Sequence, residues 1–320
     1  MPVRDVVIIG GGLAGLSAAI YLGRAQRDVL LVDSGHSMAR WEPEVQNYLG
    51  FPEGVAGEEL IRKGRTQAHD SGAILVDDEI LEVVGFRGRF EARGRKETYV
   101  ADKLLLATGI FHVPPDLPDV EHCLGHSMFF CKDCDGTRVR GKRVLVFGWC
   151  NDAVEYALGL LHYTASVAVA TNGRKGQWDA QHAAWLNEYS IPLYCGKIAS
   201  VNRDECELRA LILETGERLE ADALFTTRGD IFHNAFAKAL GAEIDTSGEI
   251  VVDACLQTTV PGLYAAGCVT PANCQMIIAA GQGAIAAQAI NRSLFEESLR
   301  NHNLRRLRER QELVARTARS

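Results

Sequence analysis

The stretch VVIIGGGLAGLSAAIYL, residues 6–22, decides the fold of this chain. Val6–Ile9 is a continuous apolar run, and small and apolar residues continue from Gly12 to Gly23 after a turn of glycines. A second apolar run, Val29–Val32, follows and ends at Asp33. Continuous apolar runs joined by a helical pattern are typical of parallel strands buried on both faces. The sequence therefore predicts a βαβ unit at the start of the chain.

The turn of this unit carries a dinucleotide-binding pattern. Gly10, Gly12 and Gly15 complete G-x-G-x-x-G between the strand and the helix. In this pattern the glycines allow a tight turn, a close approach to pyrophosphate and close packing of helix on strand. The phosphates then lie at a helix N-terminus, where free N–H groups favour anions. Asp33 ends the second strand, where a carboxylate can accept hydrogen bonds from ribose hydroxyls.

The same arrangement recurs once along the chain. Arg143–Phe147 is expected to be a strand, Asp152–His162 a helix and Ser166–Ala170 a strand. The intervening stretch FGWCNDA, residues 147–153, matches G-x-G-x-x-A except that Cys150 replaces the middle glycine. The second unit therefore has the architecture of a nucleotide-binding turn with a side chain where the pattern requires none.

Composition restricts the classes of partner. The 320 residues are 47% hydrophobic, which suits two ordinary domains with sizeable cores. The net charge of −7 offers no basic field for nucleic acid or anionic membrane, so we expect small molecules or proteins as partners. The sequence has no stretch of about 18 apolar residues, so we expect no membrane-spanning helix. Nine cysteines, an odd number, favour mostly reduced thiols and a cytoplasmic location.

A proline-rich stretch and a later segment that returns to the first domain suggest where the domains divide. The stretch VPPDLPD, residues 113–119, cannot continue a helix or a central strand and is read as a linker. We therefore expect one discontinuous domain, 1–115 plus 244–320, with a second domain inserted at 116–243.

The polar tail Asn301–Ser320 holds six arginines and two glutamates. It is expected to be a solvated helical end, with covering of a cofactor or docking of an acidic partner as alternatives.

Four motifs, in order and spacing, resemble the FAD-dependent thioredoxin reductases of the low-molecular-weight type. They are GGGLAGLSAA near the N-terminus, LLLATG at 104–109, CKDCDG at 131–136 and TTVPGLYAAG at 258–267. The resemblance covers nearly the whole chain. It implies an α/β fold of two nucleotide-binding (Rossmann-like, three-layer) domains, the second inserted into the first. It also implies FAD in the first site and a homodimer.

The resemblance also implies which residues surround the flavin. The TTVPGLYAAG segment is expected to pass beside the flavin, with the helix Gln275–Ile290 abutting the ring. Cys268 stands where the family usually has an aspartate that contacts the ribityl chain. The residues expected to bind the cofactor are Gly10, Gly12, Leu13, Ala14, Gly15, Asp33, Ser34, Thr108, Gly109, Gly267, Cys268, Gln275, Met276 and Ile277.

Cys131 and Cys134 form the one close C-x-x-C pair. Thiols at this spacing can close a small disulfide ring, and a nearby cation or helix N-terminus favours the thiolate that performs exchange. A zinc half-site with His122 or His126, or two inert structural cysteines, are the alternatives. His126, five residues before Cys131, is expected to be a surface histidine, with a part in proton transfer as the alternative.

The resemblance assigns roles to this motif. It implies that Cys134 exchanges electrons with the flavin, that Cys131 attacks the disulfide of a thioredoxin-like protein, and that Asp135 moves the protons. The remaining cysteines have no spacing that predicts chemistry. They are Cys123, Cys195, Cys206, Cys255 and Cys274.

The second nucleotide turn departs from the family in two places. Family members bind NADPH through an intact glycine turn and through a histidine and arginine cluster after the next strand. Here Cys150 interrupts the turn and TNGRKG, residues 171–176, replaces the cluster. We therefore expect that NADPH is not the donor. A ferredoxin-type protein is one candidate donor, as in some relatives that lack these features. The alternatives are an oxygen-dependent dithiol oxidase, an NADPH-dependent reductase with an atypical site, and a flavin-binding redox sensor.

Overall fold

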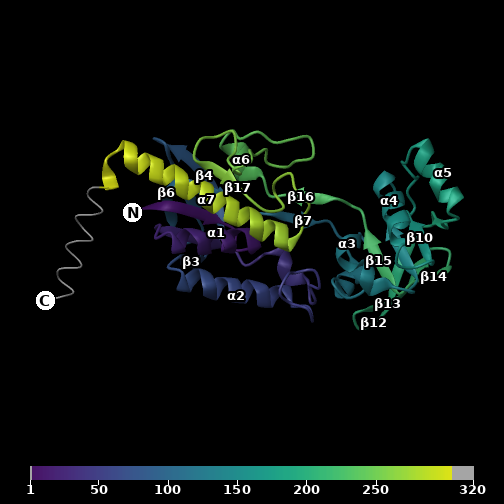
Figure 1. Cartoon of the computed structure of the whole chain (residues 1–320). Helices are drawn as coiled ribbons and strands as arrows, with labels where there is room; N and C mark the ends of the chain where they lie inside the picture. Colours follow the sequence, from purple (N-terminus) through teal and green to yellow (C-terminus); the bar gives the residue numbers. More distant parts are fainter. Residues whose placement is uncertain (1, 305–320) are drawn as a thin grey trace. The chain divides into compact units, whose positions relative to one another are not determined.

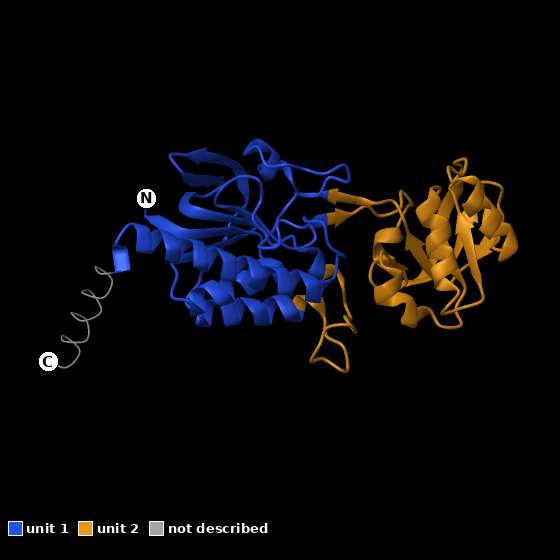
Figure 2. Cartoon of the chain, turned by 45° about the horizontal axis from the view of Figure 1, so that its top comes forward, with its two compact units in different colours: residues 1–39, 59–110, 232–320 blue, residues 40–58, 111–231 orange. Residues whose placement is uncertain are grey.

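The structure is a computed structural model in which residues 2–304 are described. It divides into two compact units (Figure 2). Among the described residues, unit 1 holds 2–39, 59–110 and 232–304, and unit 2 holds 40–58 and 111–231. The paired strands β7 (Ile110–His112) and β16 (Asp230–Phe232) carry the chain from one unit to the other and back. From residue 305 onward the arginine-rich tail lies outside the described residues.

Unit 1 is built on a seven-stranded sheet in the order β3-β2-β1-β6-β5-β4, with β17 also paired to β6. β1, β2, β3, β6 and β17 are parallel, whereas β4 and β5 form antiparallel pairs beside β6. The strands are β1 (Val3–Ile9), β2 (Val29–Asp33), β3 (Ile74–Asp77), β4 (Ile80–Phe86), β5 (Arg89–Gly94), β6 (Thr98–Leu106) and β17 (Leu263–Ala265).

The helices of unit 1 are α1 (Leu13–Arg24), α2 (Gly57–Asp70), α6 (Ala235–Ala239) and α7 (Met276–Arg300), with a 3-10 turn η1 (Met38–Trp41) that runs into unit 2. α1, α2 and α7 share one hydrophobic cluster with Val6 and Ile8 of β1. Figure 1 shows the three helices, with α1 between α2 and α7. Val7 and Ile9 belong to a second cluster, on the other face, that includes α6. Because neighbouring residues of β1 bury both faces, the strand is continuously apolar.

Unit 2 repeats the pattern around a five-stranded parallel sheet in the order β11-β10-β9-β15-β8. A three-stranded antiparallel sheet, β12-β13-β14, shares one hydrophobic cluster with it, and α4 and α5 share the other. The strands are β8 (Met128–Phe129), β9 (Val144–Phe147), β10 (Val167–Ala170), β11 (Leu193–Tyr194), β12 (Ile198–Asp204), β13 (Glu207–Leu213), β14 (Arg218–Glu220) and β15 (Ala223–Thr226). The helices are η2 (Val120–Cys123), α3 (Lys132–Asp135), η3 (Gly136–Val139), α4 (Asn151–Leu160) and α5 (Ala180–Glu188).

The prediction of an α/β chain with two nucleotide-binding-type folds is confirmed. The helix predicted over Gln275–Ile290 continues ten residues further, to Arg300, because Leu294 still packs in the core. Within residues 2–304, none of the helices is both long and apolar enough to span a bilayer.

Candidate functional site

The carboxyl ends of the parallel strands of unit 1 gather most of the predicted cofactor residues at one edge of the sheet. Gly10–Gly12 follow β1, Asp33 ends β2 with Ser34 directly after it, and Thr108 and Gly109 follow β6. Gly267 and Cys268 follow β17, and Gln275 caps the N-terminus of α7. Leu13, Ala14 and Gly15 begin α1, and Met276 and Ile277 begin α7. The topology therefore brings most of the predicted set to the edge where open α/β sheets bind ligands.

The glycine turn has open space beside Gly12, where a phosphate could approach, and no space beside Gly15. A Cβ at Gly12, the N-cap of α1, would have only the Ser37 hydroxyl as a described neighbour, at 3.4 Å. A Cβ at Gly15 would lie 1.9 Å from the carbonyl oxygen of Gly10. Within the described chain no side chain caps α1, so its first N–H groups face the turn. These features fit the pyrophosphate of a dinucleotide.

Asp33 is buried and held in place from two directions. Its Oδ1 accepts a hydrogen bond from the backbone N–H of Gly35 at 2.9 Å, and its Oδ2 pairs with Arg65 Nη1 at 2.8 Å. An ionised carboxylate offers about four acceptor positions, so these contacts leave acceptor capacity on the same oxygens. Asp33 therefore keeps the chemistry needed to bind ribose hydroxyls at the end of β2.

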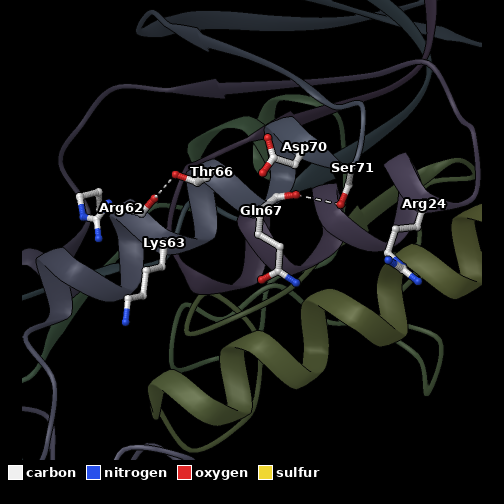
Figure 3. A pocket seen from close by; sticks show the side chains of 7 residues that line it. All are labelled: Arg24, Arg62, Lys63, Thr66, Gln67, Asp70 and Ser71. Atoms are coloured by element: carbon white, nitrogen blue, oxygen red, sulfur yellow. Dashed lines mark hydrogen bonds between the residues drawn. The ribbon is translucent and has the colours of Figure 1, made fainter.

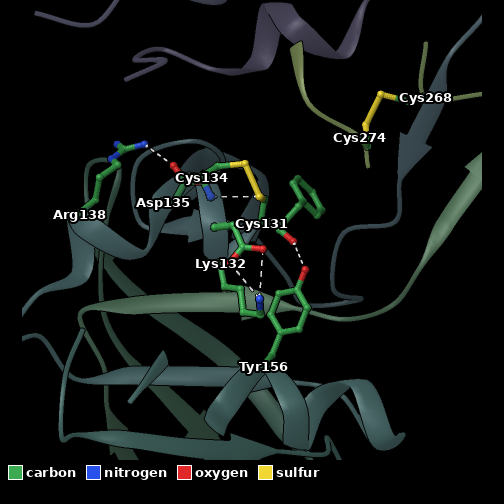
Figure 4. Close-up of a disulfide and its surroundings, with 10 residues drawn as sticks. Cys131, Lys132, Cys134, Asp135, Arg138, Tyr156, Cys268 and Cys274 are labelled. Atoms are coloured by element: carbon green, nitrogen blue, oxygen red, sulfur yellow. Dashed lines mark hydrogen bonds and ion pairs between the residues drawn. A yellow bond between two sulfur atoms is a disulfide. The ribbon is translucent and has the colours of Figure 1, made fainter. Parts of the chain in front are cut away.

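Cys131 and Cys134 are joined in a disulfide at the start of α3, in unit 2 (Figure 4). Both residues are partly exposed. The backbone N–H of Cys134 points to Cys131 Sγ at 3.1 Å. A donor in this position stabilises a thiolate on Cys131 once the disulfide opens. The geometry thus favours Cys131 as the sulfur that carries negative charge in exchange.

Asp135 follows the disulfide directly and is buried. Its backbone N–H bonds to the carbonyl of Cys131 at 3.1 Å, and its Oδ1 pairs with Arg138 Nη1 at 3.1 Å. Burial raises the pKa of Asp135 above its usual range, although the Arg138 guanidinium acts in the opposite direction. A carboxyl with a raised pKa beside a disulfide is suited to give and take protons as thiols form.

Glu42 is a second acid in the same cluster, and the sequence did not suggest it. Burial, reinforced by the charge of Asp135 and partly offset by Arg138 and His112, raises the pKa of Glu42 to about 7. Glu42 belongs to the segment 40–58, which packs with unit 2. A Cβ at Gly125 would lie 2.6 Å from the carbonyl oxygen of Trp41, which shows how closely this segment packs on the rest of unit 2.

The zinc alternative for the C-x-x-C pair finds no support. Its two sulfurs are bonded to each other, whereas zinc requires thiolates. Within residues 2–304, the one group of side chains close enough to share a metal is Asp119, Glu121 and His122, all exposed, and it contains neither cysteine. His126 is exposed, as expected of a surface histidine.

The segment after β10 bonds directly to the second nucleotide turn, at the start of α4. The backbone N–H of Gln177 donates to the carbonyl of Trp149 at 2.6 Å, and Gln177 forms a parallel bridge with Cys150. Cys150 is the N-cap of α4 and is exposed. Asp152 adds a negative charge in the first turn of the helix. A phosphate at this N-terminus would meet a strand of backbone, a thiol and a carboxylate.

Two of the cations near this turn interact with Trp149. The guanidinium of Arg174, from the TNGRKG stretch, lies 4.2 Å from the ring centre of Trp149, and that of Arg228 lies 5.9 Å from it. A guanidinium over an indole face is held by a cation–π interaction. Asn151 and Asp179 add two further hydrogen bonds between the turn and the segment before α5. The loop that holds a 2′-phosphate in the family here folds back onto the turn.

A second disulfide, Cys268–Cys274, lies in unit 1 between β17 and α7. The sequence reading treated Cys268 as a cofactor contact and saw no chemistry for Cys274, so it missed this pair. The two cysteines are six residues apart, a spacing that matches no redox motif. The signal in the sequence was that both cysteines stand in the short segment between the TTVPGLYAAG motif and the helix expected from Gln275.

A shallow pocket on the outside of unit 1 is unrelated to this edge (Figure 3). Arg24 ends α1, and Asp70 and Ser71 stand at the end of α2. Helices that connect parallel strands end at the edge opposite to the strands' carboxyl ends, so these residues lie away from the glycine turn. The lining residues are Arg24, Arg62, Lys63, Thr66, Gln67, Asp70 and Ser71.

Comparisons with known proteins agree with this arrangement. The family model described as pyridine nucleotide-disulphide oxidoreductase matches residues 4–287. The thioredoxin reductase of Treponema pallidum (strain Nichols) is 31% identical over 296 residues, which cover 89% of this chain and 95% of the relative. The crystal structure of HlmI has a TM-score of 0.88 at 28% identity and covers 96% of this chain and 97% of its own. The atypical thioredoxin reductase TRi from Desulfovibrio vulgaris Hildenborough is 36% identical, with a TM-score of 0.53 and coverage of 92% and 99%.

Proposed function

Because the chain belongs to the pyridine nucleotide-disulphide oxidoreductase family and is an FAD-dependent disulfide oxidoreductase of the thioredoxin reductase type, we propose that it reduces a thioredoxin-like protein without using NADPH. The observation that carries the proposal is the Cys131–Cys134 disulfide followed by the buried Asp135 carboxyl. FAD, when bound, supplies the ability to take an electron pair from a donor and to pass it to a disulfide. We assign FAD to the predicted residues at the carboxyl edge of unit 1.

The thiols and the acid have distinct proposed roles. Reduction of the disulfide breaks its S–S bond and leaves two sulfurs that together take two electrons and two protons. Cys131 then attacks the substrate disulfide as a thiolate, and the N–H of Cys134 stabilises its charge. Cys134 resolves the mixed disulfide and closes the ring again. Asp135, whose pKa is raised, supplies protons to the departing thiolates of the substrate.

The turn at α4 supports a donor other than NADPH. The backbone of Gln177 bonds to the turn beside the Cys150 side chain. Asp152 places a negative charge in the first turn of α4, which opposes a bound pyrophosphate. The guanidinium of Arg174 lies over the ring of Trp149. We propose a ferredoxin-type donor, since a one-electron protein donor needs no nucleotide pocket. We also propose a homodimer, which sedimentation velocity tests.

The altered nucleotide turn at the start of α4, with Cys150 in the glycine pattern, also favours a second candidate, an oxygen-dependent dithiol oxidase. In that reaction a substrate dithiol loses two electrons and two protons to become a disulfide, and oxygen takes them up as hydrogen peroxide. Peroxide formed in proportion to added dithiol supports the oxidase. Dithiol-independent flavin reduction by ferredoxin supports the reductase.

Single cysteine variants test the thiol assignment. Cys131→Ser and Cys134→Ser should each retain bound flavin and lose reduction of a thioredoxin disulfide, because exchange needs both sulfurs. Cys123→Ser is the matched control, since Cys123 is a buried free thiol in the same unit, and it should retain activity. Turnover that survives the loss of Cys131 or Cys134 contradicts the proposal.

A further inference from the structure

The Cys268–Cys274 disulfide is open to solvent at one end. Cys274 is exposed and Cys268 is half-buried, with their Cα atoms 4.9 Å apart (Figure 4). Disulfides are opened by a thiolate that reaches one of the sulfurs along the S–S axis, so access governs which disulfides exchange. Exposed disulfides are also those that tend to be labile rather than structural. Cys274 therefore offers a sulfur that an external thiol can reach.

The other end of the loop is fixed. The backbone N–H of Gly267 donates to Gln282 Oε1 of α7 at 2.7 Å. The hydroxyl of Thr270 donates to the carbonyl of Gly267 at 2.8 Å. These bonds hold the backbone around Cys268 whether or not the S–S bond is intact. Opening the disulfide therefore leaves the fold of this edge in place, which a reversible redox site requires.

The position of the pair connects it to the nucleotide edge of unit 1. β17 runs parallel to β6, and β6 parallel to β1, so Cys268 and the glycine turn stand at the same edge of the sheet. Gly267 has φ +86°, and a Cβ on it would lie 3.0 Å from the Cβ of Ala14 in α1. The disulfide is thus attached to the residue that packs against the nucleotide-binding helix.

The reduced form of the pair is also favoured locally. Cys274 directly precedes Gln275, the N-cap of α7, a helix of 25 residues. The N-terminus of a long helix carries partial positive charge, and no acidic residue stands in its first turn to oppose it. A thiolate on Cys274 lies in the region where such a helix end lowers the energy of a negative charge. Solvent exposure, a hydrogen-bonded backbone around Cys268 and the partial positive charge of the α7 N-terminus therefore all bear on this one disulfide.

We propose that Cys268–Cys274 is a second redox-active disulfide, a site that accepts electrons from a dithiol. The thiolate of the dithiol attacks Cys274 Sγ, the S–S bond breaks, and Cys268 leaves as a thiolate that takes a proton. The second thiol of the dithiol attacks the mixed disulfide and releases Cys274. In total, two electrons and two protons pass to the two cysteines, and the dithiol leaves as a disulfide. The site stands independently of the donor and substrate proposed for Cys131–Cys134.

Site-resolved alkylation tests this proposal. The flavin-loaded Cys131→Ser/Cys134→Ser double variant is equilibrated anaerobically in mixtures of reduced and oxidised dithiothreitol, or of reduced and oxidised thioredoxin. It is then alkylated and analysed by peptide mass spectrometry. The matched protein is the Cys268→Ser/Cys274→Ser double variant, in which alkylation of Cys131 and Cys134 gives the ratio of reduced to oxidised dithiol that opens their disulfide. The native chain, analysed peptide by peptide, gives the same comparison should either double variant fail to fold.

The expected result is that Cys268 and Cys274 become alkylated together, at a ratio of reduced to oxidised dithiol within about tenfold of the ratio that opens Cys131–Cys134. Alkylation with both reagents assigns the site to protein and small dithiols, and alkylation with dithiothreitol alone assigns it to small dithiols. A Cys268–Cys274 peptide that stays disulfide-linked with both reagents, at ratios that fully open Cys131–Cys134, overturns the proposal.

Discussion

The backbone N–H of Gln177 donates a hydrogen bond to the carbonyl oxygen of Trp149 at 2.6 Å, across the N-terminus of α4. Backbone of the segment after β10 is therefore bonded to the turn, in addition to the Cys150 side chain that interrupts the glycine pattern. We predict that Cys150→Gly alone gives no measurable gain in NADPH affinity, as judged by fluorescence titration or calorimetry. Cys150→Gly combined with Gln177→Pro, which removes the N–H donor, is the matched variant in which a gain is expected. Tight NADPH binding by Cys150→Gly alone contradicts this account of the turn.

Replacement of Asp135 should slow the thiol steps and leave the cofactor in place. Proton transfer by a positioned acid contributes about 10²-fold or more to a rate. We expect Asp135→Asn to lower turnover with a thioredoxin disulfide by about that factor, with unchanged flavin content and an intact Cys131–Cys134 pair. Asp133→Asn is the control, because Asp133 is exposed and pairs with Lys132 at 2.9 Å. Equal losses in the two variants contradict a specific role for Asp135.

Two glycines of the first turn should respond differently to a methyl group. Gly12→Ala adds a Cβ whose one described neighbour is Ser37 Oγ at 3.4 Å, so the fold should be retained. It should nevertheless weaken FAD binding by about tenfold or more, because the pyrophosphate approaches the backbone there. Gly15→Ala places a Cβ 1.9 Å from a carbonyl oxygen and should lower the melting temperature. Unchanged FAD affinity in a folded Gly12→Ala protein places the phosphates elsewhere.

Glu42 should make the stability of the protein depend on pH. Its folded pKa of about 7 lies above the ordinary value of 4.5, so the folded chain holds its proton more tightly than the unfolded chain. The stability that the folded chain gains from the protonated Glu42 carboxyl is complete below about pH 4.5 and is lost as the pH rises through 7. Between pH 4 and 8, the free energy of unfolding of the native chain should therefore fall relative to Glu42→Gln by up to about 3 kcal/mol. Urea unfolding at a series of pH values measures this difference, and parallel profiles would show that Glu42 titrates normally.

Much of the fold could be predicted because its decisive residues are close in sequence. Val6–Ile9 and Val144–Phe147 are continuous apolar runs, and each is followed within a few residues by the turn and the small-residue helix that pack on it. The disulfide between Cys131 and Cys134 was predictable for the same reason, since the motif is local.

The parts that sequence reasoning missed depend on contacts made only in the fold. Glu42 and Asp135 are far apart in sequence, and no pattern in either segment indicates that they meet. Cys268 and Cys274 pair because the loop after β17 turns back before α7 begins. The return of Gln177 to Trp149 likewise follows from how the TNGRKG segment folds. The domain borders at 115/116 and 243/244, the cofactor contacts, the homodimer and the cytoplasmic location stay predictions.

We propose that this protein has the flavin and thiol chemistry of a thioredoxin reductase with a different electron source. Anaerobic stopped-flow measurement of flavin absorbance tests it most directly, with NADPH, NADH and reduced ferredoxin compared on the same holoprotein. We predict that reduced ferredoxin bleaches the flavin rapidly and that neither nicotinamide does so at micromolar concentration. Rapid bleaching by micromolar NADPH would contradict it.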